Sequence, residues 1–119
     1  MTRLLRVVFP SYVVLVVVLS LVPRGPDLPE GGDKLAHFGA YTLMAILCMP
    51  LTTRFRSAVG MFLFVVAVGA ALEGFQAMIP ARTASGWDLV SNLVGATAGT
   101  LVWLGAVKVR QRWPTRVES

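Results

Sequence analysis

The sequence is poor in charge: only 14% of its 119 residues are Asp, Glu, Lys or Arg, whereas a soluble domain carries about 25%. At the same time, 55% of the residues are hydrophobic and the mean hydropathy is +0.70. These properties argue against a small soluble domain and indicate a membrane protein. Each transmembrane helix needs about 20 apolar residues. We therefore expect an all-α membrane protein, with four transmembrane helices joined by short loops, in a single domain over residues 1–119.

Cysteine and the common catalytic motifs are also scarce. The single cysteine, Cys48, lies inside an apolar run and has no second cysteine to pair with, so it reads as a small packed side chain. Neither Ser85 nor Ser91 lies in a G-x-S-x-G pattern, and no H-E-x-x-H metal motif occurs. The sequence therefore indicates neither a serine hydrolase of that type nor a zinc protease.

Basic residues outnumber acidic ones, and their positions matter more than the net charge of +5. No basic face with interleaved aromatic residues is present, which argues against nucleic-acid binding. The basic residues instead gather near the ends of apolar runs: Arg3, Arg6, Arg54, Arg56, Lys108, Arg110, Arg112 and Arg116. This distribution is typical of membrane topology signals.

Four apolar runs, at about 4–22, 35–51, 58–79 and 87–107, predict the membrane spans. The first run contains Pro10, which membrane helices tolerate. A cleaved signal peptide is the competing interpretation of this run, but the run is long and lacks an A-x-A-like exit. Counting basic residues predicts that both termini and the turn at 52–57 are cytoplasmic, and that the loops at 23–34 and 80–86 are external.

Polar residues inside the last three predicted spans lie near the external ends. In "DKLAHFGAY" (33–41), acid, histidine and tyrosine follow one another at intervals of four and share a helix face. Inserting an ionisable side chain at the bilayer centre costs roughly 2.5–3.5 kcal/mol of free energy. Several such side chains at one depth therefore indicate a shared structural or functional role. We expect a single inward-facing polar layer in the outer half of the bundle, formed by Asp33, Lys34, His37, Tyr41, Glu73, Gln76, Asp88 and Asn92.

Simpler roles compete for several of these residues. Asp33 could act as a helix N-cap, Asp88 as a first-turn acid that faces the helix dipole, and Lys34 could extend to the interface. Gly95 and Gly99 form a small-xxx-small pair that serves helix packing or a homodimer. His37 and Glu73 lie too deep for caps.

These two residues could pair with each other, or Glu73 could pair with Arg82. The polar cluster would then only lock the helices together.

The sequence contains, in this order, "DKLAH", "EGFQ", a following arginine, and "DLVSN" with trailing glycines. The order and spacing of these motifs resemble the pattern of the VanZ-like family of small bacterial membrane proteins. The resemblance covers about residues 30–102. It implies a multi-pass protein of the bacterial inner membrane. It also suggests a link to glycopeptide resistance, since the family's namesake is associated with resistance to teicoplanin. The matching motif residues are Asp33, Lys34, His37, Glu73, Gln76, Arg82, Asp88 and Asn92.

Two functions of different class fit these observations. In the first, the polar layer binds or modifies an anionic cell-envelope molecule, which is a lipid headgroup or a lipid-linked cell-wall precursor. His37 and Glu73 are then the candidate proton carriers, since histidine exchanges protons readily near neutral pH, and Asp88 is a third catalytic candidate. The candidate ligand-binding residues are Asp33, Lys34, Tyr41, Gln76, Arg82 and Asn92.

In the second, the protein is a non-enzymatic structural or interaction protein whose polar cluster only holds the helices. A divalent metal ion bound by Asp33, His37, Glu73 and Asp88 is a further alternative, which the ligand spacing does not favour.

Overall fold

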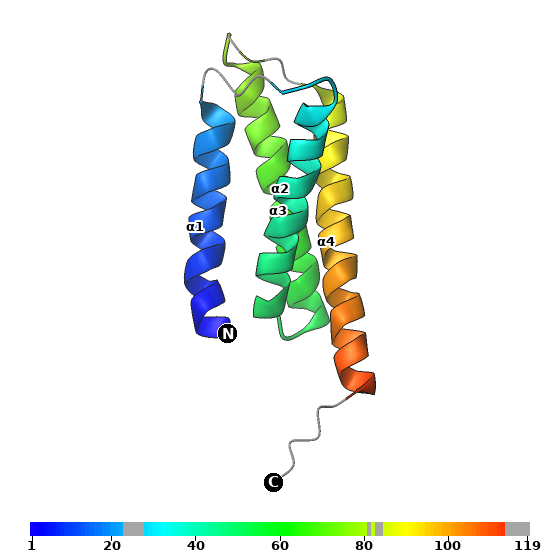
Figure 1. Cartoon of the computed structure of the whole chain (residues 1–119). Coiled ribbons are helices and arrows are strands. Elements are labelled where there is room, and N and C mark those ends of the chain that lie inside the picture. The colour runs from blue at the N-terminus through cyan, green and yellow to red at the C-terminus, as the bar shows by residue number, and fades with distance from the viewer. Residues whose placement is uncertain (23–27, 81, 83–84, 114–119) are drawn as a thin grey trace.

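The computed structural model describes residues 1–22, 28–80, 82 and 85–113. They form a bundle of four helices (Figure 1): α1 (Thr2–Leu21), α2 (Gly32–Cys48), α3 (Phe55–Ala77) and α4 (Gly86–Arg112). A short 3-10 turn, η1 (Met49–Leu51), extends α2. All four helices are long and apolar enough to cross a membrane, with α2 and η1 counted as one span. The predicted helical architecture with four candidate spans is thereby confirmed.

The helix ends differ in places from the predicted spans. α2 begins at Gly32 rather than near 35, because the acid in its first turn favours the amino end of a helix. α4 continues to Arg112, well past the predicted end at 107, and in Figure 1 it projects beyond the other helices. Its basic last turn suits the carboxyl end of a helix, and Pro114 in the sequence explains the stop. Pro10 lies inside α1 without ending it.

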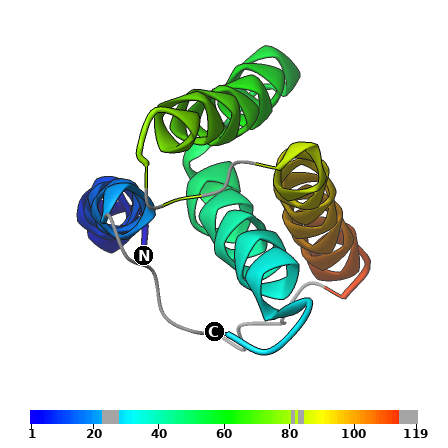
Figure 2. The same ribbon diagram turned by 90° about the horizontal axis from the view of Figure 1, so that it is seen from above.

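Helix α2 occupies the centre of the bundle. Seen along the bundle in Figure 2, it lies between α1, α3 and α4, and its most extensive packing is against α4. The side chains of Met44, Cys48 and Met49 are completely buried, as is Val65 of α3. Cys48 is therefore the packed hydrophobic side chain that its position in the sequence predicts.

Close packing of α2 on α4 depends on two glycines of α4. A Cβ atom on Gly95 would collide with the carbonyl oxygen of Phe38, and one on Gly99 would collide with that of Thr42. The two backbones therefore approach more closely than any other residue would allow. Because both glycines are buried against α2 of the same chain, they offer no surface for the homodimer that the sequence also allowed.

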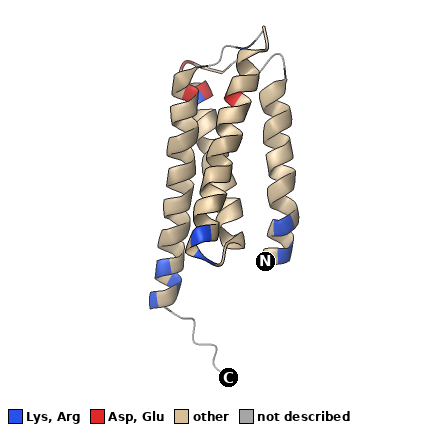
Figure 3. Cartoon of the chain, turned by 180° about the vertical axis from the view of Figure 1, so that it is seen from behind, with Lys and Arg blue, Asp and Glu red and all other residues tan. Residues whose placement is uncertain are grey.

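The two ends of the bundle differ in charge. α1 begins and α4 ends at the same end (Figure 1), and most of the Lys and Arg residues of the helices lie there, whereas Asp and Glu gather at the opposite end (Figure 3). The polar residues singled out in the sequence therefore lie at the end away from the basic one.

We expect Gly95→Ala to destabilise the bundle by about 1–3 kcal/mol, the usual effect of overpacking, because the added methyl group meets the Phe38 backbone. Thermal unfolding in detergent measures the change. Gly105→Ala, on the same helix, is the matched control, since its Cβ has nothing within 4 Å. An equal loss in both variants would show that the close approach of α2 and α4 is not the cause.

Candidate functional site

The amino end of α2 places an acid and the only histidine on one face. The chain turns at Gly31, which adopts a φ of 77° and occupies the N-cap position. The interpretation of Asp33 as the N-cap is therefore wrong, since Asp33 lies within the first turn and makes no cap hydrogen bond. Its Oδ1 instead lies 3.9 Å from Nε2 of His37, one turn along the helix.

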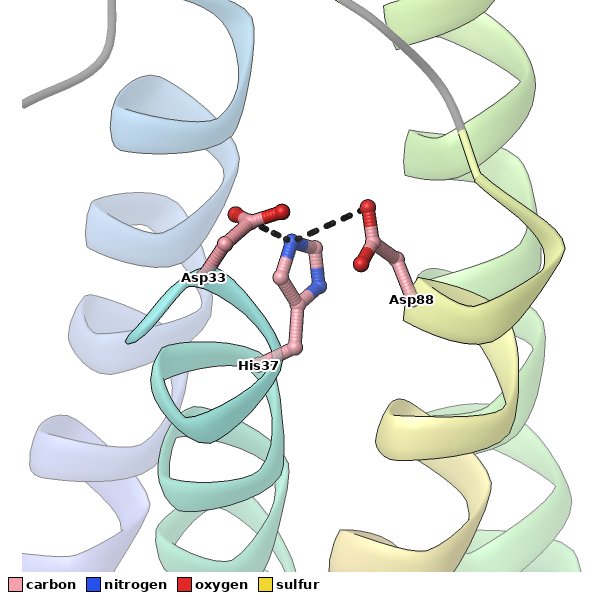
Figure 4. A group of neighbouring side chains, drawn as sticks. All are labelled: Asp33, His37 and Asp88. Atoms are coloured by element: carbon pink, nitrogen blue, oxygen red, sulfur yellow. Dashed lines mark ion pairs between the residues drawn. The ribbon is translucent and has the colours of Figure 1, made fainter. Parts of the chain in front are cut away.

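Helix α4 brings two more residues to the same imidazole ring. Asp88 lies in its first turn, as predicted, and is only 2% exposed. Its Oδ2 lies 4.0 Å from Nε2 of His37, on the side of the ring away from Asp33 (Figure 4). One turn further, Oδ1 of Asn92 lies 2.8 Å from Nδ1 of His37. An amide oxygen only accepts hydrogen bonds, so Nδ1 donates to Asn92 and Nε2 is the ring nitrogen that faces the carboxylates.

Glu73 has a different partner from the ones the sequence suggested. Its Oε1 accepts a hydrogen bond of 2.7 Å from the backbone N–H of Ser85, the N-cap residue of α4. It therefore pairs with neither His37 nor Arg82. Its second oxygen, Oε2, is buried and has no hydrogen-bond partner among the described residues. Glu73 joins the end of α3 to the start of α4.

Gln76 and Arg82 bind the end of α1. Nε2 of Gln76 donates to the carbonyl oxygen of Ser20 at 2.9 Å. Nε and Nη2 of Arg82 donate to the carbonyl oxygens of Val22 and Leu19 at 2.8 and 2.9 Å. The last carbonyl groups of a helix lack partners within it, so these side chains satisfy the end of α1. The sequence contains no signal that could have shown these backbone acceptors.

The remaining candidates lie at opposite extremes of burial. Tyr41 is buried, and its ring approaches Gly69 of α3, where a Cβ atom would lie 3.1 Å from Cε1 of the tyrosine. Asn92 contacts the same glycine, so Gly69 makes room for both side chains, a role that the sequence analysis missed. A signal was present, because Gly69 precedes Glu73 by one helical turn. Lys34 lies exposed and forms no ion pair with another described residue.

A cavity of about 460 Å³ lies between α1, α2 and the end of α3. Most of its wall is apolar, with Val16, Leu19 and Ala40 among the lining residues. Its polar side chains are Ser20, His37, Tyr41, Gln76 and Arg82.

The expected single polar layer is thus two adjoining groups. One group joins α2 to α4, the other joins α3 to α1, and Glu73 links them by joining α3 to α4. His37 belongs to the first group and also lines the cavity.

The structure also brings three possible metal ligands together. Ligand atoms of Asp33, His37 and Asp88 lie within 4.8 Å of one another. Glu73, the fourth candidate from the sequence, is not part of this group.

We expect Glu73→Gln to fold nearly as well as the native protein, because the amide oxygen still accepts the Ser85 N–H hydrogen bond. Glu73→Leu removes the acceptor and should cost about 1–3 kcal/mol, the usual effect of leaving a partly buried donor unpaired. Folded yield and unfolding temperature in detergent check this. If both variants lose the same stability, the charge rather than the hydrogen bond holds α3 to α4.

Comparison of the sequence with models of known protein families found no match, and neither did comparisons with curated proteins and with solved structures. The resemblance to the VanZ-like family therefore rests on the motif residues alone.

Proposed function

We propose that the chain is a VanZ-like protein of the bacterial inner membrane that binds an anionic amphiphile of the cell envelope, which is a lipid or a lipid-linked cell-wall precursor. The observation that carries this proposal is the cavity between α1, α2 and α3. Its wall combines apolar side chains with an arginine, a glutamine and a histidine. Such a combination suits a ligand with a hydrocarbon part and a charged head.

The size and position of the cavity fit this ligand class. A volume of about 460 Å³ lies within the range of about 300–1,000 Å³ usual for small-molecule sites. Leu19, Val22 and Leu28 line it and are partly exposed, so the cavity reaches the surface of the bundle. Arg82 keeps its positive charge at any physiological pH, and its Nη1 makes no hydrogen bond to another described residue. This nitrogen can face a phosphate or carboxylate.

The distribution of charge supports binding from the outer leaflet. The positive-inside rule assigns the basic end of the bundle to the cytoplasm. Figure 3 shows the basic residues gathered at one end of the bundle. Both termini would then face the cytoplasm, and the cavity, which is lined by residues of the opposite end, would lie at the depth of the outer leaflet.

A chemical step on the bound molecule would depend on His37. Its Nε2 is 3.9 and 4.0 Å from the nearest carboxylate oxygens, which is too long for hydrogen bonds, and the ring lines the cavity. Glu73 suits the role of a proton carrier less well, because its Oε1 is engaged with Ser85 and it does not line the cavity. The connection to glycopeptide resistance follows from the family resemblance and is part of the same proposal.

A purely structural role is the second candidate. The observation that favours it is that Glu73, Gln76 and Arg82 all bind backbone groups of neighbouring segments. In that case the polar groups lock the bundle and the cavity has no specific occupant.

Filling the cavity distinguishes these two functions. Ala36 lines the cavity and is exposed, so Ala36→Phe should place a ring in it without disturbing the buried core. We expect the anionic lipid that co-purifies in mild detergent, measured by mass spectrometry, to fall about ten-fold. Ala71→Phe is the matched control, since this exposed alanine of α3 lies outside the cavity. Equal lipid content in the native protein and both variants would favour the structural role.

The orientation has its own test. Glu30→Cys, in the exposed segment before α2, should react with a membrane-impermeant maleimide on intact bacterial cells, whereas Thr53→Cys, at the other end of the bundle, should not. The native Cys48 is buried and should contribute little background. Labelling of residue 53 alone would invert the orientation and contradict binding from the outer leaflet.

A further inference from the structure

We infer that Asp33, His37 and Asp88 form a binding site for a divalent transition-metal ion. The three side chains come from two helices and converge on one point at the acidic end of the bundle (Figure 4). Nε2 of His37 lies 3.9 Å from an oxygen of Asp33 and 4.0 Å from an oxygen of Asp88. For ligand atoms within 4.8 Å of one another, the central point lies about 2.0–2.5 Å from each, close to zinc–ligand distances of about 2.0–2.2 Å.

The arrangement of charge calls for a cation at this point. Two carboxylates face Nε2 of His37, while the other ring nitrogen, Nδ1, is engaged with Asn92, so Nε2 is the nitrogen that can bind an ion between the carboxylates. The two carboxylate oxygens lie 3.9 and 4.0 Å from Nε2, beyond the hydrogen-bonding distance of about 2.7–3.2 Å, so neither is bonded directly to the ring. In addition, Oδ1 of Asp88 is buried without a hydrogen-bond partner in the described part of the chain. A bound ion would neutralise both carboxylates at once.

The surroundings of His37 match those of a metal ligand. Metal-binding histidines nearly always donate their other ring N–H to a carbonyl, carboxylate or water, which fixes the orientation of the ring. Here Oδ1 of Asn92 accepts at 2.8 Å. Asn92 is itself buried, and Gly69 packs against it. The ring is therefore held in place before any ion binds.

The ligand set and its exposure indicate which ions fit. One imidazole nitrogen and two carboxylate oxygens suit Zn²⁺ or Mn²⁺, whereas Ca²⁺ prefers six or more oxygen ligands. The Asp33 side chain is 61% exposed, while those of His37 and Asp88 are 17% and 3% exposed. An ion can thus enter from the solution past Asp33. Three protein ligands leave a coordination position for water or another molecule.

This inference stands apart from the lipid proposal, because neither Asp33 nor Asp88 lines the cavity. The two sites share only His37. A protein that binds metal but retains no anionic lipid would support the metal site and contradict the lipid proposal.

The test uses the full chain in detergent, freed of any affinity tag and of metal by chelation, and then dialysed against Zn²⁺ or Mn²⁺. Elemental mass spectrometry should find about one ion per chain, and Co²⁺ added in place of Zn²⁺ should give visible absorption bands. His37→Gln and Asp88→Asn should lower Zn²⁺ affinity at least ten-fold. Asn92→Leu should lower it about 10–100-fold, since it removes the acceptor that orients the ring.

Two further variants make the result decisive. Asp33→Asn changes an exposed side chain, so it should fold normally and still lose at least ten-fold in affinity. Glu30→Gln removes an exposed acid that is not part of the site, and it should bind metal like the native protein. The inference is overturned if the native protein retains no ion, or if Asp33→Asn and Glu30→Gln bind metal equally well.

Discussion

The contact between α2 and α4 is the constraint on which the rest of the structure depends. Gly95 and Gly99 let the two backbones meet at the carbonyl groups of Phe38 and Thr42. That approach sets the distance between the first turns of both helices, and so brings Asp88 and Asn92 to the ring of His37. A larger residue at either glycine would push α4 away. The distances within the polar cluster therefore depend on this contact between the two helices.

Most of the polar side chains at the acidic end of the bundle that hold helix ends in place bind backbone groups. Glu73 accepts from the N-cap residue of α4, and Gln76 and Arg82 donate to the end of α1. Helix ends always leave such groups unpaired, and an unpaired group is costly where water is scarce. These side chains therefore replace water at the helix ends. The cluster of His37 with two carboxylates differs, because it brings side chains together with one another rather than with backbone groups.

Periodicity and the count of basic residues predicted much of this arrangement. The interval of four between Asp33 and His37 placed them on one face, and the charge distribution placed three helix ends at one level. Other features follow only from the three-dimensional packing. The partners of Arg82 are carbonyl oxygens, which every residue carries, so nothing in the sequence distinguishes them. The spacing of the possible metal ligands did not favour a metal site, because Asp88 lies on a different helix from Asp33 and His37 and only the packing brings the three together.

Helix α1 is joined to the bundle by groups that also form the cavity. Tyr12 of α1 donates to the carbonyl oxygen of Ala40, and Gln76 and Arg82 donate to the last turn and the end of α1. Ala40, Gln76 and Arg82 all line the cavity. Because Gln76 and Arg82 hold the end of α1 and also form part of the cavity wall, the position of this helix and the shape of the cavity are thermodynamically linked. A displacement of α1 would therefore change the cavity wall, and anything that fills the cavity would in turn change how firmly this helix is held.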